Sequence, residues 1–246
     1  MKTTTSCMLW VCASVSAIHA QKQYSHGNPT ADEQYLLELI NRARSNPAAE
    51  GLRLANTTDR DVKFAVDFFG VDVARLKKDF ASYPARPPLA MNPQLLAAAR
   101  RHSNDMARKN FQSHTGSDGS TIGSRIADAG FRSASISENI YSNLVSSTFL
   151  VHAGLTIDWG RGPGGVQPGL GHRTNVMGLG NSTYREVGIG VVARSGEASD
   201  RYGKLAVTQD YGTESNSVFF LLGVAYQDDN RNGICDPGEG MSGTGP

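Results

Sequence analysis

The sequence predicts an α+β fold, because its helical and strand patterns occupy different parts of the chain. Apolar residues recur at helical spacing in several segments between residues 31 and 159, whereas runs rich in β-branched residues follow from residue 187 onward. Regular alternation of strands and helices would predict a parallel sheet, so this order favours an α+β arrangement. With 246 residues, the chain is long enough for one domain with short appendages.

Residues 1–20 are predicted to be a signal peptide. Lys2 supplies a positive charge, residues 8–18 form a short apolar stretch, and Ala20 offers a small residue for cleavage. The apolar stretch is too short to cross a bilayer as a helix, and no later segment is apolar over a sufficient length. The chain is therefore expected to be secreted without a transmembrane segment. Residues 21–30 are polar and are predicted to be a disordered linker.

Cysteine use agrees with a fold that depends on its apolar core. Cys7 and Cys12 fall within the predicted signal peptide, so only Cys235 would remain and no internal disulfide could form. A domain of this size can bury enough surface to be stable without disulfides.

The first predicted helix follows Thr30. This residue is a favoured N-cap, two acidic residues follow in the first turn, and apolar residues from Tyr35 to Ala43 recur at helical spacing. The helix is expected to end at Asn46-Pro47, because the residue before a proline disfavours helical backbone. Between residues 48 and 88, two apolar clusters predict two short helices before a proline-rich break.

The clearest helix is predicted to begin at Pro93. Asn92 is a favoured N-cap, and proline is common at the first helical position because its missing N–H would have no partner there. Apolar residues then follow at helical spacing as far as Met106. The remaining predictions are two shorter helices, 124–129 and 148–159, and three strands, 187–192, 205–208 and 218–226.

Four segments in order resemble the signature of the CAP superfamily, the cysteine-rich secretory, antigen 5 and pathogenesis-related proteins, also called SCP-like proteins. They are Leu36 to Arg44, Pro88 to His114, Ser137-Glu138-Asn139-Ile140 and Gly171-His172-Arg173-Thr174-Asn175. Ser137 stands where the family has glycine. The resemblance covers residues 31–214, with an insertion at about 48–88. It implies a three-layer α-β-α sandwich in a single CAP domain.

The resemblance also implies a cleft in which two histidines and two acidic residues converge. Matched position by position, the cleft residues are His114, Glu138 and His172. The family's second glutamate has no direct counterpart here, and either His152 or Asp158 could take its place.

The residue types in this cleft also fit a metal site. Neutral imidazoles and a carboxylate are typical ligands of zinc, and three protein ligands leave a position open for water. His114, His172 and Glu138 are therefore candidate zinc ligands. The alternative is a hydrogen-bonded network in which these side chains only fix loops to the core.

Residues 228–239 match a twelve-residue calcium loop, with Gly233 at the sharp turn. The flanks predict a strand and a tail over residues 218–246 in place of the two helices of an EF-hand. The segment resembles the start of calcium-stabilised β-modules in bacterial surface proteins, and a solvated acidic turn is the alternative. The candidate calcium ligands are Asp228, Asn230, Asn232, Ile234 through its carbonyl oxygen, Asp236 and Glu239.

Charge and motifs exclude several classes of function. The net charge is +1 without a basic stripe, so no nucleic-acid partner is expected. The chain has no Gly-x-Ser-x-Gly, no His-Glu-x-x-His and no phosphate-binding loop with a Gly-Lys-Ser/Thr end.

The sequence therefore predicts a non-enzymatic protein that binds an extracellular ligand, lipid-like, peptide or glycan, with or without a divalent metal. One alternative is a zinc-dependent extracellular hydrolase in which Glu138 is the general base. Another is a calcium-stabilised adhesion or scaffold module. The ligand, the partner and the oligomeric state are not indicated.

Overall fold

A four-stranded mixed sheet forms the middle layer of the protein. In a computed structural model, its strand order is β1 (Ala90–Met91), β3 (Glu186–Ala193), β4 (Leu205–Glu214) and β2 (Ser133–Asn143). β1 runs parallel to β3, whereas β4 is antiparallel to both of its neighbours. The structure describes residues 25–143, 145–181, 183–196, 201–215, 220, 222–231, 233 and 235–240. The predicted signal peptide and residues 21–24 of the predicted linker lie outside these residues.

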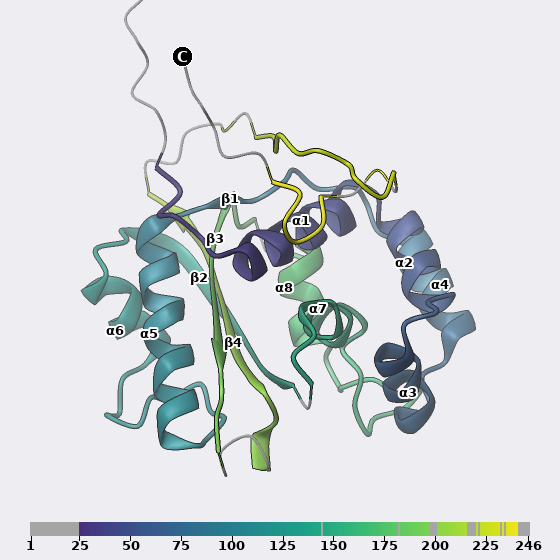
Figure 1. Ribbon diagram of the computed structural model, residues 1–246, viewed down its shortest axis with the longest axis horizontal. Helices are drawn as coiled ribbons and strands as arrows, with labels where there is room; N and C mark the ends of the chain where they lie inside the picture. The colour runs from purple at the N-terminus through teal and green to yellow at the C-terminus, as the bar shows by residue number, and fades with distance from the viewer. Residues whose placement is uncertain are drawn as a thin grey trace, which may run out of the picture.

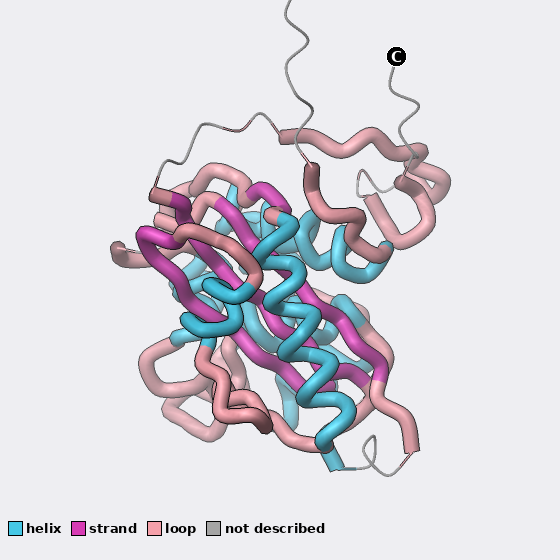
Figure 2. Tube along the Cα trace, turned by 90° about the vertical axis from the view of Figure 1, so that its left-hand side faces the viewer, coloured by secondary structure: helices cyan, strands magenta, loops and turns pink. Residues whose placement is uncertain are grey.

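Helices cover both faces of the sheet (Figure 1). α5 and α6 form one layer, and Figure 2 shows α5 crossing in front of the strands. α1, α7 and α8 form the other layer, with α2, α3 and α4 outside it. This arrangement is the α-β-α sandwich that the sequence predicted. The helices are α1 (Ala31–Ser45), α2 (Pro47–Ala55), α3 (Arg60–Phe69), α4 (Val73–Ser82), α5 (Pro93–Lys109), α6 (Ile122–Asp128), α7 (Thr148–Ile157) and α8 (Gly171–Met177).

The capping residues recognised in the sequence start the two longest helices. The Thr30 hydroxyl accepts the Glu33 backbone N–H, and the Glu33 carboxylate accepts the Thr30 N–H, which completes a capping box. The Asn92 side-chain oxygen accepts two backbone N–H groups of α5. The Asn92 amide also donates to Glu186 at 2.8 Å, so this cap joins α5 to β3.

α5 lies unusually close to β3, because two glycines of that strand face it. A Cβ atom at Gly188 would lie 1.9 Å from the carbonyl carbon of Leu95, and one at Gly190 would lie 2.6 Å from that of Ala99. The Ser103 hydroxyl also donates to the carbonyl oxygen of Gly190 at 2.9 Å. Glycine is required at these positions because the backbone of the helix occupies the space of a side chain.

The insertion differs from the prediction, since it contains three helices and not two. α2 follows α1 after a single residue, Asn46, whose backbone N–H donates to Arg42 and whose side-chain oxygen accepts the N–H of Ala49. Asn46 therefore ends one helix and begins the next. The sequence indicated only the first of these two roles.

The strand predicted over 218–226 is wrong for the part that the structure describes. Residues 220 and 222–225 have no regular secondary structure, and Tyr226 forms only an isolated bridge with Gly240. The described residues between 222 and 240 run beside α1 (Figure 1), and Leu222 and Val224 line pockets together with residues of that helix. Leu222 and Val224 are half-buried beside this helix, which takes the place of a neighbouring strand.

Candidate functional site

Two solvent-accessible imidazoles each contact a buried carboxylate. Nδ1 of His114 lies 2.8 Å from Oε1 of Glu138, and Nδ1 of His172 lies 2.8 Å from Oδ1 of Asp158. The imidazole side chains are 58% and 22% exposed, whereas the carboxylates are 2% and 0% exposed. A carboxylate that accepts Nδ1–H fixes the tautomer of a neutral imidazole and leaves Nε2 with its lone pair.

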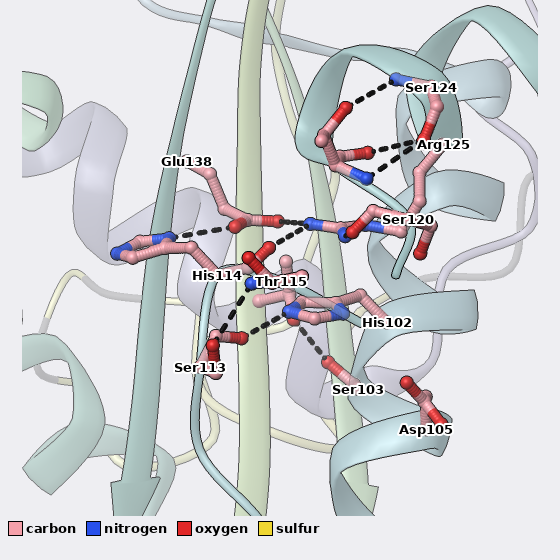
Figure 3. A network of polar contacts seen from close by, with 12 residues as sticks. His102, Ser103, Asp105, Ser113, His114, Thr115, Ser120, Ser124, Arg125 and Glu138 are labelled. Atoms are coloured by element: carbon pink, nitrogen blue, oxygen red, sulfur yellow. Dashed lines mark hydrogen bonds and ion pairs between the residues drawn. The ribbon is translucent and has the colours of Figure 1, made fainter. Parts of the chain in front are cut away.

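Arg125 of α6 holds the first pair together (Figure 3). Its buried guanidinium donates to Oε2 of Glu138 at 2.6 Å and to the carbonyl oxygen of His114 at 3.1 Å. Burial by itself would raise the pKa of Glu138, but the hydrogen bond from His114 and the charge of Arg125 hold that pKa below its usual value. Glu138 is therefore ionised at neutral pH, and both of its oxygens are engaged.

A second carboxyl group lies beside Glu138. Asp210 of β4 stands opposite Glu138 in the register of β2 and β4, and its side chain is completely buried. Burial and the neighbouring charge of Glu138 raise the pKa of Asp210 well above its usual value. As the pH rises, Asp210 therefore loses its proton after Glu138. Asp210 lies just beyond the predicted strand 205–208, and nothing in the sequence indicated its burial beside Glu138.

Asp158 orients His172 and also closes the start of α8. Asp158 ends α7 in the left-handed conformation, with φ 58°. Its Oδ2 accepts the backbone N–H of His172 at 3.0 Å and that of Arg173 at 3.3 Å. The first N–H groups of a helix have no partner within the helix, so Asp158 satisfies donors that would otherwise be unpaired.

Asn139 connects the two histidine–carboxylate pairs. It follows Glu138 on β2, and its amide donates to the carbonyl oxygen of His172 at 3.3 Å and to Gln209 at 3.2 Å. Its side-chain oxygen accepts the amide of Asn175 at 2.8 Å. The segments that carry Glu138 and His172 are thus joined by one buried polar network.

His152 lies in a different cluster. Its Nε2 is 2.8 Å from Oε1 of Glu50, and both side chains are buried. Glu50 also forms ion pairs with Arg42 at 3.2 Å and Arg53 at 2.8 Å. Of the two candidates for the fourth site residue, the structure therefore brings Asp158 to His172 and places His152 against Glu50.

The contacts of Glu138 bear on the predicted zinc ligands. Within the described part of the chain, no three His, Cys, Asp or Glu side chains are grouped around a common point for a metal ion. Glu138 contacts His114 and Arg125. A carboxylate that orients a metal-binding histidine commonly accepts a ring N–H in this way. In each pair, Nε2 is the ring nitrogen that the carboxylate does not engage.

The predicted calcium loop is folded back on its own acidic residues. Oδ2 of Asp228 accepts the N–H of Gly233 at 2.8 Å, and the Asn230 amide donates to Asp236 at 2.7 Å. The Glu239 carboxylate accepts the N–H of Asp236 at 2.9 Å. Asn232 and Ile234 lie outside the described residues, so four of the six candidate ligands have a described position.

Comparisons with known proteins give the family of the chain. The model of the CAP family, described as the cysteine-rich secretory protein family, matches residues 37–211. A solved structure of an extracellular protein containing an SCP domain, from Bacillus anthracis str. Ames, is 21% identical with a TM-score of 0.38. That match covers 64% of this chain and 44% of the other, so this chain spans less than half of that protein's length.

No curated protein matches the chain significantly. The family match is sufficient by itself to assign the chain to a family, because it extends over more than half of the 246 residues. It includes both histidine–carboxylate pairs and all four strands except the last residues of β4. The order of its segments and the layers they form lead to one conclusion: this chain belongs to the CAP family of cysteine-rich secretory proteins.

Proposed function

We propose that this protein is a secreted binding protein in which His114 and His172 hold a divalent metal and, beside it, an extracellular ligand. The observation that carries the proposal is the pairing of each accessible imidazole with a buried carboxylate. Histidines that bind metals commonly donate their second ring N–H to a carboxylate, which fixes the ring and raises the basicity of the ligating nitrogen. A bound zinc ion would polarise a water molecule or a ligand oxygen in its open positions.

The same contacts favour binding over hydrolysis. A general base needs an oxygen that can reach the proton of a water molecule. Both oxygens of Glu138 are occupied, one by His114 and one by Arg125, and the side chain is 2% exposed. Asp158 is likewise buried and bound to His172. The two acids are placed to orient the histidines, whereas the imidazoles face the ligand, which is lipid-like, peptide or glycan in this proposal.

Secretion is part of the proposal, and it rests on the residue pattern of positions 1–20 and on the family. Among the described residues, no helix combines the length and the apolar character needed to cross a membrane. Expression of the full chain with a C-terminal tag, followed by mass spectrometry of the secreted product, would show whether cleavage follows Ala20.

Zinc titration tests the proposed site. By calorimetry near pH 7.5, the chain should bind Zn²⁺, and the variant with both His114→Ala and His172→Ala should lose that binding. Glu138→Gln and Asp158→Asn should weaken it by about 10–100-fold, because each removes a carboxylate that orients a ligand. His26→Ala, which changes an exposed histidine outside both pairs, is the control. Equal zinc affinity in the double variant would refute the proposal.

We also propose that residues 228–239 bind calcium. Its support is the ligand pattern together with the hydrogen bonds of Asp228, Asn230, Asp236 and Glu239 within one closed loop. A loop of this kind, outside a pair of EF-hands, should bind with a Kd on the order of 10⁻⁴ to 10⁻³ M. Bound calcium would stabilise the loop beside α1.

Two adjacent aspartates provide a matched test of the calcium proposal. Asp228 is at the first ligand position, whereas Asp229 is outside the ligand pattern and accepts the Gln227 amide. Asp228→Asn should reduce calcium affinity at least about tenfold, whereas Asp229→Asn should change it little, although both lose one charge. Calorimetry with Ca²⁺ measures both. Absence of calcium binding by the unmodified chain up to 10 mM, about ten times the weakest Kd expected, would contradict the proposal.

A further inference from the structure

A cavity of about 450 Å³ is lined in part by Arg125, the residue that pairs with Glu138. One wall is the C-terminal half of α5, from Arg101 to Lys109, and the other is the segment from Ser117 to Arg125. Figure 3 shows His102 and Asp105 of α5 together with Ser120 and Arg125 from the opposite wall. Neither His114 nor His172 lines this cavity, so it is separate from the proposed metal site.

Positive charge predominates in the lining. Four of the lining side chains are cations, Arg101, Arg108, Lys109 and Arg125. Within the described residues, Arg108 and Lys109 form no ion pair, so their charges are not neutralised locally. Their position in the last turn of α5 complements the helix dipole, but that effect does not require them to line a cavity.

The two carboxylates of the cavity are already engaged. Asp118 pairs with Arg101 at 3.1 Å and accepts the backbone N–H of Ser120 at 2.8 Å. Asp105 accepts both the N–H and the hydroxyl of Ser117, at 2.7 and 2.6 Å. These bonds hold the two walls together, and they leave the cations at the rim available to an anion.

Arg125 is the buried cation of the lining. It is 1% exposed, and its two terminal nitrogens are bound to the carbonyl oxygens of Ser120 and His114 and to Glu138. Its Nε is buried and has no hydrogen-bond partner among the described residues. Glu138 balances the charge of this buried guanidinium, so Arg125 fixes the wall, while the exposed Arg108 and Lys109 carry the charge that an anion would meet.

We propose that this cavity binds a tetrahedral oxyanion, a sulfate or phosphate group carried by a small polar molecule. Guanidinium groups match the oxygens of such anions in geometry and charge. The volume exceeds that of a bare anion and falls in the range of small-ligand sites, and Asn104, Ser117 and Ser120 offer polar contacts to the remainder of the ligand. The inference does not depend on the proposed metal site, since Arg108 and Lys109 lie outside both histidine–carboxylate pairs.

The test uses the full chain at constant ionic strength in sodium chloride. Inorganic phosphate, glucose 6-phosphate and glucose 6-sulfate are titrated by NMR chemical-shift perturbation. The unmodified chain should bind at least one of the two sugar esters more tightly than inorganic phosphate, with a Kd on the order of 1 mM or below. Preference for the phosphate ester or for the sulfate ester identifies the source of the anion, and either preference supports the proposal.

Two double variants distinguish binding in the cavity from nonspecific electrostatic attraction between the anion and basic side chains elsewhere on the protein. Arg108→Gln with Lys109→Gln should weaken ester binding by about tenfold or more. Lys77→Gln with Lys78→Gln removes the same charge from α4, outside the cavity, and should leave binding within about twofold. Equal losses in both variants would overturn the proposal, as would absence of binding to the unmodified chain.

Discussion

Gly188→Ala is expected to cost about 4 kcal/mol or more of the free energy of unfolding. The added Cβ would lie 1.9 Å from the carbonyl carbon of Leu95 and 2.2 Å from the backbone nitrogen of Leu96. Both are backbone atoms of α5, so no side chain can rotate to make room. The helix would have to move off the sheet, and the buried contacts of Leu95 and Leu96 would be lost. A loss of this size is comparable to the whole stability of a small domain.

Denaturation in urea, followed by circular dichroism, measures this effect. Gly123→Ala is the control, because a Cβ there would meet only the Thr121 hydroxyl, at 3.8 Å, and the residue is within α6. Alanine favours helix, so this variant should be unchanged or more stable by up to about 1 kcal/mol. Gly188→Ala with a stability within about 1 kcal/mol of the unmodified chain would show that α5 does not contact β3 as closely as described.

Glu50→Ala is expected to destabilise the protein by about 3–5 kcal/mol at pH 7. The carboxylate is buried and lies between Arg42, Arg53 and His152. Its removal would leave the Arg42 guanidinium and the buried His152 ring without their acceptor. Asp67→Asn is the control, since the Lys63–Asp67 pair is exposed and its loss should change stability little.

The effect of Glu50 should depend on pH in a defined direction. Burial would raise the pKa of Glu50, but the hydrogen bond and charge of His152, together with Arg42, hold that pKa far below its usual value. A depressed pKa means that the unfolded chain takes up the proton first as the pH falls. The stabilisation is therefore complete above the unfolded pKa of about 4.3 and decreases below it. The difference between Glu50→Ala and the unmodified chain should accordingly be smaller at pH 3 than at pH 7, and a constant difference would contradict this explanation.

Much of the fold could be predicted because its signals are local. The caps at Thr30 and Asn92 mark helix starts within three or four residues, and the β-branched runs of β3 and β4 need no knowledge of their partners. β2 was not predicted, since Ser133–Asn143 is rich in serine and has few apolar residues. Its strand conformation comes from pairing with β4 along its whole length, which is a tertiary contact.

The site was predictable only in part for the same reason. The resemblance to the family pointed to His114, Glu138 and His172, but the partners of these residues depend on contacts between distant segments. Asp158 itself has the left-handed backbone conformation at the end of α7, and the turn it makes brings its carboxylate to His172. From the sequence, Arg125 would be expected to be an exposed residue of a short helix. Tertiary packing buries it against Glu138.

The double role of Asp158 has a consequence for how such a protein can change during evolution. Asp158 orients His172 and also satisfies backbone donors of α8, so its loss would weaken the fold along with the site. The accessible rings of His114 and His172 have no comparable structural duty. In a related protein that no longer binds the ligand, substitutions should therefore accumulate first at the two histidines. Asp158 should be retained for longer, because the start of α8 still requires it.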